Sequence, residues 1–429
     1  MRLQKKRRRW PWVLLVLVLL SALGYGFWSK YQAEQHLPME EVGTTPPPIY
    51  TEAIVEDIDP VTEDTDPAVE DDEEPIIPDP PFSAAVTGRV EKDAFDLSSD
   101  HLALMEAFMS AWYAPLAEFG SPDFDRLFTK DEDADAHADA LRTLIAIRRA
   151  ALTDLRMNSV DYVLTVTAVE EEEDGHLRVE ADETAVMRFA ATPDTDSILY
   201  DMPHIFIFDD ESLRLYHHEA DDNPYFSFTY EEDSDYDAEF QRILRAIERR
   251  HLLRGEQSTV TLECDHPYDR AAAEEYLRTY CSQRNPRWYA YDEVGGNCMN
   301  FGSQVLLAGG IPEDERGDEE WYWDGQNDLD LSWINVGRFY DYARKNEGYG
   351  LVADTEAGYY TGEVGDVLIV GFNGDHRHTT IISNVVKDRD GNTVDYLISC
   401  NTTNYEDFPA AAYYYTFHRL IKVYGWNEG

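Results

Sequence analysis

The run from Gly295 to Gly310 constrains this chain more strongly than any other part of its sequence. Gly295-Gly296 predicts a tight turn, Phe301 to Ala308 reads as an apolar helix, and Gly309-Gly310 ends it. Cys298 therefore lies in the first turn of a predicted helix, at the positive end of the backbone dipole. That field favours thiolate over thiol, and the thiolate is the nucleophile. The run predicts a candidate catalytic cysteine.

Two further candidates lie on strands that follow this helix. Gly365 to Val370 and His376 to Ile382 read as strands around an Asn-Gly-Asp turn, because Asn-Gly favours the positive φ of such turns. A thiol nucleophile needs a histidine to exchange protons and a third group to hold the imidazole. His378 lies on the second strand, and Asn401 ends the next one. We predict that Cys298, His378 and Asn401 form a catalytic set.

The second strand carries two histidines, and only one of them is assigned to this set. His376 and His378 are two residues apart, so both are expected to face the same side of the strand. His376 lies next to the turn and is interpreted as a solvated hairpin residue. The alternative for Asn401 is that it only caps a turn, which is a common use of Asn after a strand.

Many ordered matches to a known family run from Tyr268 to the C-terminus. They are Tyr268-Asp269-Arg270-Ala271-Ala272-Ala273, Tyr276, Tyr280, Asn285-Pro286, the Cys298 run to Gln304, Leu307 to Pro312, Ser332-Trp333, Gly365-Asp366-Val367 and His378 to Ile382. This pattern resembles the "putative amidase domain" family, which is similar to NlpC/P60 and papain-like cysteine hydrolases. The resemblance implies an α+β domain whose nucleophile-bearing helix packs on an antiparallel sheet. It implies hydrolysis of an amide or peptide bond, with cell-wall peptide as the substrate by analogy.

The chain departs from the family pattern at several positions. The family usually reads Gly-Asp-Cys-Thr-Asn-Phe, whereas here Asn297 replaces Asp and Met299 replaces Thr. Gly302 stands where a larger apolar residue is common, and Asn401 stands where His is more usual. Asn297 and Met299 motivate the alternative hypothesis, a catalytically degenerate binding or spacer module at the cell surface that keeps the amidase fold.

Asn297 and Gln304 are the candidates for lining the site or its oxyanion position. Backbone N–H groups at the helix start, including that of Cys298, are candidates for stabilising the oxyanion. For Gln304 the favoured interpretation is an ordinary helix residue. No cofactor and no metal ion is expected, because the sequence contains no C-x-x-C pair, ligand-spaced histidines, Walker motif or dinucleotide fingerprint.

The N-terminus predicts export of the rest of the chain. Five basic residues, Lys5 to Arg9, precede an apolar run from Trp10 to Trp28 that has the length of a membrane-spanning helix. The basic residues before this run orient the chain with its N-terminus inside. We predict a single-pass membrane anchor with extracellular C-terminal domains. A cleaved signal peptide with Ala22-Leu23-Gly24 near its cleavage site is the alternative.

The formal net charge of -49 excludes nucleic acid as a partner, because such binding rests on Lys and Arg contacts to phosphates. Many of the acidic residues lie in a Pro-rich stretch that has too little apolar surface to form a core. This stretch is expected to be a disordered linker. The predicted segments are residues 1–30 (basic end and anchor), 31–96 (linker), 97–232 (α+β domain), 233–258 (connecting helix) and 259–429 (amidase domain).

The middle region predicts helices followed by antiparallel strands. Leu104, Phe108 and Trp112 share one helix face, and alternating apolar residues follow from Tyr162. The pattern weakly resembles the cone-shaped nuclear-transport-factor-2 (NTF2-like) group. His217 and His218 are interpreted as surface residues.

The chain has four cysteines, Cys264, Cys281, Cys298 and Cys400. If Cys298 is a free nucleophile in an exported protein, Cys264 and Cys281 are the conceivable disulfide pair. Cys400 is interpreted as a buried strand residue near the site.

Overall fold

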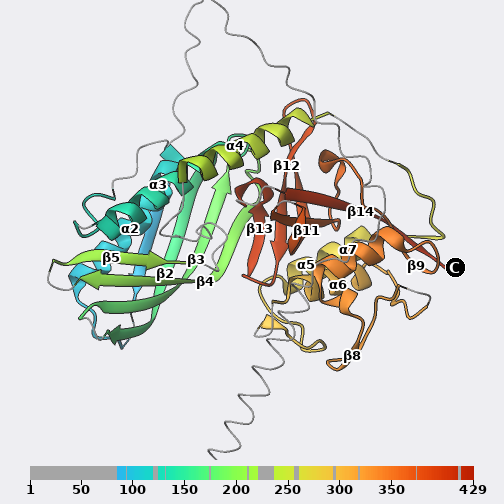
Figure 1. The fold of residues 1–429 in the computed structure, drawn as a ribbon, viewed down its shortest axis with the longest axis horizontal. Helices are drawn as coiled ribbons and strands as arrows, with labels where there is room; N and C mark the ends of the chain where they lie inside the picture. The colour runs from blue at the N-terminus through green and yellow to red at the C-terminus, as the bar shows by residue number, and fades with distance from the viewer. Residues whose placement is uncertain are drawn as a thin grey trace, which may run out of the picture. The chain divides into compact units, whose positions relative to one another are not determined.

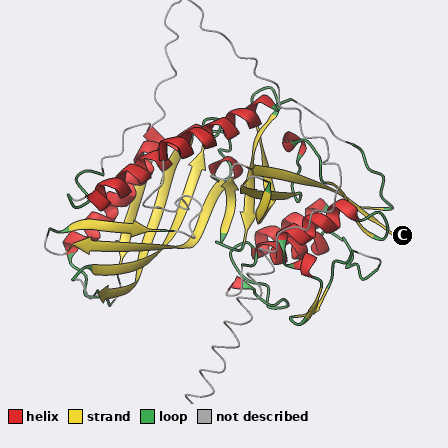
Figure 2. Ribbon diagram, in the orientation of Figure 1, coloured by secondary structure: helices red, strands yellow, loops and turns green. Residues whose placement is uncertain are grey.

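Long antiparallel strands dominate the structure, and a few helices cover them (Figure 1, Figure 2). The computed structural model describes residues 85–92, 94–118, 124–130, 132–172, 175–209, 212–220, 236–255, 260–292, 296–316, 319–372, 374–413 and 417–429. All of them fall within one of the two compact units of the chain, Asp79–Gly429. The fold class is α+β, as the sequence predicts.

The helices are α2 (Ser99–Glu118), α3 (Glu132–Ala151), α4 (Tyr236–Leu252), α5 (Arg270–Tyr280), α6 (Cys298–Ala308) and α7 (Val336–Lys345), with short 3-10 turns η2 (Leu331–Trp333), η3 (Tyr359–Thr361) and η4 (Ala410–Ala412). The strands are β1 (Ala85–Glu91), β2 (Met157–Glu171), β3 (Leu177–Phe189), β4 (Asp196–Asp209), β5 (Arg214–Glu219), β6 (His266–Pro267), β7 (Trp323–Gly325), β8 (Asp328–Leu329), β9 (Gly350–Asp354), β10 (Val367–Phe372), β11 (Asp375–Lys387), β12 (Thr393–Cys400), β13 (Tyr405–Pro409) and β14 (Phe417–Asn427).

One sheet runs through both regions that the sequence predicts as separate domains. The described residues form a twelve-stranded sheet in the order β1-β2-β3-β4-β13-β12-β11-β10-β14-β6, with β5 paired to β4 and β9 to β14. Strands β4 and β13 join the two regions, with Tyr405 opposite Leu199 and Glu406 opposite Ile198. Apart from the parallel pair β1–β2, the neighbouring strands of this sheet are antiparallel.

The core of the middle region follows from the alternation of apolar residues on its strands. Every second residue of β3 is buried, and Val179, Met187 and Phe189 have no exposed surface. Helix α2 places Phe108 and Trp112 against this face, both fully buried, as the helix spacing in the sequence predicts. Burial of large apolar side chains on both sides of the contact is what holds helix and sheet together.

Strand β1 corrects the predicted extent of the linker. Residues 85–91 pair in parallel with residues 159–165 of β2, although the sequence assigned them to a disordered segment ending at residue 96. The remainder of that segment and the predicted anchor at residues 1–30 lie outside the described residues. Within the described part of the chain, the helices are too short or too polar to cross a membrane.

Helix α4 is bound to the C-terminal strands through polar contacts. The Arg250 guanidinium lies 2.6 Å from Nδ1 of His418 on β14, whereas Arg254, just beyond the end of α4, pairs with Asp154 of the middle region. Close to Arg250, Asp395 of β12 is buried and accepts a hydrogen bond from the Ala411 backbone N–H at 3.3 Å. Burial raises the pKa of the Asp395 carboxyl to about 7, against the opposing attraction of Arg250.

Asp395→Asn is expected to stabilise the protein at pH 8 and to have less effect at pH 5. The pKa of this carboxyl is higher in the folded protein than in the unfolded chain. The free energy of unfolding of the wild type therefore falls as the pH rises from about 4 to about 7. Asparagine does not ionise, so the variant should gain on the order of 2 kcal/mol relative to the wild type across that interval. Urea unfolding at the two pH values measures the difference.

Asp388→Asn is the matched control on the neighbouring turn. Hydrogen bonds from the side chain and backbone of Asn392 lower the pKa of Asp388, so its removal should act in the opposite direction. An Asp395→Asn effect that does not change between pH 5 and pH 8 would contradict the assignment.

Candidate active site

Helix α6 begins at Cys298, as the sequence predicts, and packs on strand β11. Gly296 has φ of +98°, a conformation that few other residues adopt, and it leads the chain into the helix. Farther along the helix, a Cβ atom at Gly302 would lie only 3.2 Å from Cγ2 of Thr379. The glycine at this position therefore allows the helix backbone to approach the strand closely.

Asn297 fixes the start of α6 to the end of β12. Its side chain donates from Nδ2 to Asn401 Oδ1 at 2.9 Å, and its Oδ1 accepts from Asn300 Nδ2 at 2.7 Å and from the Tyr291 backbone N–H at 3.1 Å. Its own backbone N–H donates to Thr402 Oγ1 at 2.6 Å. The side chain is 1% exposed, so these bonds are shielded from water. The residue predicted to line the site is thus the connection between the nucleophile helix and the sheet.

Asn297→Ala is expected to lower the free energy of unfolding by about 2 kcal/mol. The change leaves the Asn401 oxygen, the Asn300 amide and the Tyr291 N–H without this partner in a buried setting, where each unmade bond is unfavourable. Chemical denaturation measures the loss. Asn392→Ala, in an exposed turn of the same domain, is the control and should have a smaller effect. Equal losses in the two variants would contradict the role of Asn297.

Cys298 is half-buried and packs against both hydrophobic clusters that lie on the two sides of the C-terminal strands. Burial raises the pKa of its thiol, while the backbone N–H groups of Thr379, Met299 and Cys298 itself oppose that rise. The expectation from the helix dipole alone was a lowered pKa. The amide field is present at the sulfur, but loss of water contact outweighs it.

His378 lies on β11 and its imidazole bonds a tyrosine. Its Nε2 is 3.1 Å from the Tyr405 hydroxyl, and the side chain is 9% exposed. Burial lowers the pKa of His378 to about 4, so the ring is neutral at pH 7. No hydrogen bond joins His378 to Cys298 or to Asn401, all three being described residues.

A bulge in β11 places the two histidines on opposite sides of the strand, which corrects the prediction that they share one side. His378 pairs with Val370 but His376 pairs with the adjacent Gly371, so Arg377 is an extra residue. The His376 ring contacts Tyr340 of α7, with centroids 4.4 Å apart. The His378 ring instead faces Tyr405 and Tyr413.

Cys298 lies where β11 and β12 separate. Their pairing ends at Ile381 and Ser399, and beyond it the Cys400 thiol contacts the Thr379 carbonyl, with sulfur and oxygen 3.4 Å apart. The Cys298 charge contributes to raised pKa values of Cys400 and of Tyr405. Cys298 is therefore electrostatically coupled to the tyrosine that His378 contacts.

Asn401 and Gln304 form hydrogen bonds with residues other than Cys298 and His378. The Asn401 side chain is buried, accepts from Asn297 and donates to the Tyr280 carbonyl at 3.2 Å. The Gln304 side chain accepts a hydrogen bond from the Tyr276 hydroxyl at 2.8 Å and so ties α6 to α5. The sequence did not single out Tyr405, since a tyrosine at the start of a strand is an ordinary core residue until its hydroxyl partner is known.

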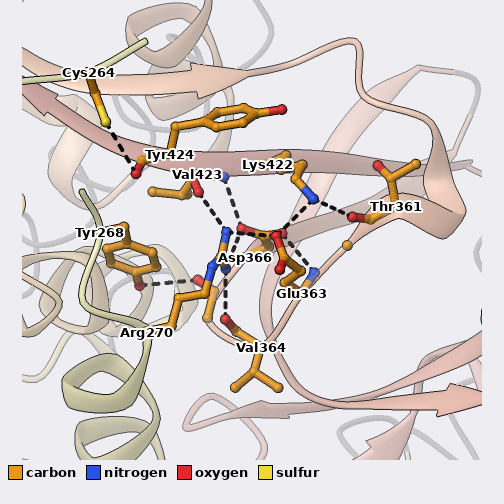
Figure 3. A network of polar contacts seen from close by, with 12 residues as sticks. Cys264, Tyr268, Arg270, Thr361, Glu363, Val364, Asp366, Lys422, Val423 and Tyr424 are labelled. Carbon is orange, nitrogen blue, oxygen red and sulfur yellow. Dashed lines mark hydrogen bonds and ion pairs between the residues drawn. The ribbon is translucent and has the colours of Figure 1, made fainter. Parts of the chain in front are cut away.

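An ionic network accounts for two of the motifs that match the family pattern, the one around Arg270 and the one around Asp366, as structural rather than catalytic features (Figure 3). The Arg270 guanidinium bonds Asp366 Oδ1 at 2.9 Å, the Val364 carbonyl at 2.8 Å and the Val423 carbonyl at 2.7 Å. Asp366 has no exposed surface and also accepts from the Glu363 backbone N–H at 2.8 Å. The network joins the start of α5 to the start of β10 and to β14.

The conceivable Cys264–Cys281 disulfide is not formed, and all four cysteines are free. The Cys264 sulfur contacts the Tyr424 carbonyl, whereas that of Cys281 contacts the Arg278 carbonyl. In the described part of the chain, no group of three or more His, Cys, Asp or Glu side chains is arranged to hold a metal ion.

The middle region contains a buried series of hydrogen-bonded polar side chains that includes His218, which corrects the interpretation of His218 as a surface residue. His218 is 3% exposed, and its Nε2 lies 3.0 Å from Nδ1 of His204. His204 Nε2 lies 2.9 Å from Glu183, which accepts from the Tyr113 hydroxyl at 2.6 Å. Burial lowers the pKa of His218 well below its usual value.

Comparison with known proteins shows what the C-terminal region is similar to. Residues 267–426 match the family described as "Putative amidase domain". A stretch of 127 residues is 36% identical to the "Uncharacterized protein YhbB" of Bacillus subtilis (strain 168) and covers 28% of this chain and 38% of that protein. No solved structure matches the chain significantly. The family match supports an amidase-like domain, and its description points to amide hydrolysis.

Proposed function

We propose that the region matching the amidase family hydrolyses amide bonds with Cys298 as nucleophile and His378 as general base. The observation that carries the proposal is a half-buried cysteine at the first turn of α6, with three backbone N–H groups acting on its sulfur. Backbone amides at a helix start are suited both to a thiolate and to the oxyanion of a tetrahedral intermediate.

The reaction begins from a neutral pair. The pKa of Cys298 is raised and that of His378 is lowered to about 4, so thiol and imidazole are both uncharged at neutral pH. The sulfur attacks the carbonyl carbon as its proton passes to the imidazole. The imidazolium then gives that proton to the departing amine, and water hydrolyses the thioester to a carboxylic acid and free thiol.

The proposed setting is outside the membrane. The basic N-terminus and the apolar run to Trp28 would anchor the chain, and the acidic Pro-rich segment would act as a spacer. An amide in cell-wall peptide is the substrate that fits this setting. The large negative charge argues against nucleic acid as a partner.

Product analysis tests the function. The full chain is incubated with cell-wall peptide fragments, and new amino termini and matching carboxylate products are counted by mass spectrometry. We expect paired products in equal amounts, and no activity from chain heated beyond unfolding. Fragments that remain intact at high protein concentration would reject hydrolysis of this substrate class.

A second candidate function is a binding or spacer module without catalysis. The raised pKa of Cys298 and the absence of a hydrogen bond between its thiol and His378, both described residues, favour it. The rate of Cys298 alkylation by iodoacetamide between pH 5 and pH 10 separates the two. An enzyme should show an inflexion that depends on His378, whereas a module should show only the titration of an ordinary buried thiol.

A further inference from the structure

The hydrogen bond that the structure gives to the imidazole of His378 is with the Tyr405 side chain. Their Nε2 and hydroxyl oxygen are 3.1 Å apart, and the Tyr413 hydroxyl lies 2.7 Å from that of Tyr405. Asn401, for which the sequence predicts this role, bonds Asn297 and a backbone carbonyl. We propose that Tyr405, supported by Tyr413, is the positioning residue for His378, an inference that rests on the proposed function.

The choice between the two tautomers of the neutral His378 imidazole supports this assignment. A neutral imidazole has one N–H and one lone pair, so the bond at Nε2 decides what Nδ1 can do. If Nε2 carries the proton and donates to the Tyr405 oxygen, Nδ1 keeps a lone pair for the thiol proton. If Tyr405 donated to Nε2, neither nitrogen of His378 could act as the base. The proposed reaction therefore requires Tyr405 to accept from Nε2–H.

The tyrosine hydroxyl suits an acceptor that must not compete for the proton. Burial raises the pKa of Tyr405 well above its usual value, with Tyr413 adding to the rise, so the phenol stays neutral. When the imidazole takes the thiol proton at Nδ1, it becomes an imidazolium that still donates from Nε2. The Tyr405 oxygen stabilises that cation by its dipole and keeps the ring from rotating.

The position of Tyr405 depends on the middle region of the chain. Tyr405 is the first residue of β13 and lies opposite Leu199 of β4. The Tyr200 backbone N–H donates to the Asn404 carbonyl at 2.9 Å, and the Tyr200 hydroxyl donates to Glu406 Oε2 at 2.9 Å. Strand β4 thus holds the residues on both sides of Tyr405, so the middle region supports the general base.

The rate of Cys298 alkylation as a function of pH tests the inference on the full chain, with the modified peptide quantified by mass spectrometry. Tyr405→Phe keeps the ring but removes the hydroxyl, so the rate at pH 7 should fall roughly tenfold and the profile should move to higher pH. Tyr413→Phe should move the profile in the same direction by less. His378→Gln should remove the inflexion.

Tyr396→Phe is the matched control, because this buried tyrosine on β12 also has two hydrogen-bond partners, neither of them His378. Its alkylation profile should equal that of the wild type although a buried hydroxyl is lost. A wild-type profile for Tyr405→Phe, with an altered one for His378→Gln, would overturn the inference and leave the proposed function standing. An unaltered profile for His378→Gln would overturn both. If circular dichroism shows that Tyr405→Phe does not fold, the Tyr413→Phe variant tests the inference instead. A shift of its alkylation profile to higher pH would support the inference, and a wild-type profile would overturn it.

Discussion

Cys298→Ser is expected to reduce amide hydrolysis at least about 10⁴-fold while leaving the fold intact. The hydroxyl is close in size to the thiol, so packing against the two hydrophobic clusters should change little. A neutral imidazole whose pKa is about 4 is too weak a base to activate an alcohol, which is far less acidic than a thiol. Single-turnover release of amine measures the loss.

Cys264→Ser is the matched control for that experiment. Cys264 is also half-buried, but it lies in the segment before β6 and contacts the Tyr424 carbonyl of β14. Its replacement should leave the rate within a factor of about two, and alkylation should still occur at Cys298. A Cys298→Ser protein that hydrolyses at the wild-type rate would remove the cysteine from the mechanism.

Arg270→Met is expected to destabilise the protein by about 3–5 kcal/mol, because it leaves a buried carboxylate without its cation. Asp366 has no exposed surface, and even with Arg270 present burial raises its pKa. Loss of the arginine removes the attraction that opposes this rise. The deficit relative to the wild type should therefore grow as the pH rises and shrink in acid, where the carboxyl is protonated. Urea unfolding at several pH values measures it.

A second substitution shows whether charge is the cause. Arg270→Met combined with Asp366→Asn removes both charges and keeps an acceptor for the backbone N–H groups, so the pair should be more stable than Arg270→Met alone. Arg188→Met, which breaks exposed ion pairs with Asp161 and Asp196, is the control and should lose less than about 1 kcal/mol. Equal losses for Arg188→Met and Arg270→Met would contradict the ionic account.

Local patterns predicted the elements of the candidate site better than its contacts. The glycine turn and apolar run predicted a helix starting at Cys298, and the Asn-Gly-Asp turn predicted the return strand that became β11. The bulge at Arg377 was not predictable, because an extra residue in a strand depends on the partner strand. It separates His376 from His378. The partners of Asn401 are likewise distant in the sequence, since they are the side chain of Asn297 at the start of α6 and the backbone carbonyl of Tyr280 at the end of α5.

Long-range pairing was also beyond the sequence patterns. Nothing local indicates that Tyr405 pairs with Leu199, more than two hundred positions away, so two domains were expected where one sheet exists. The acidic, Pro-rich composition led to a wrong prediction for residues 85–91, which form strand β1 at the end of a stretch that was predicted to be a linker. The surface interpretation of His218 failed because its polarity is satisfied by His204 inside the core.

The continuous sheet has a practical consequence for dissecting this protein. A recombinant fragment beginning at residue 259 would retain Cys298 and His378 but would strip β4 from β13. Strand β13 would then be an edge strand with unpaired backbone N–H and C=O groups, and such groups readily form hydrogen bonds with a strand of a second chain. Such a fragment should self-associate or precipitate, and its inactivity would say nothing about the chemistry of the intact molecule.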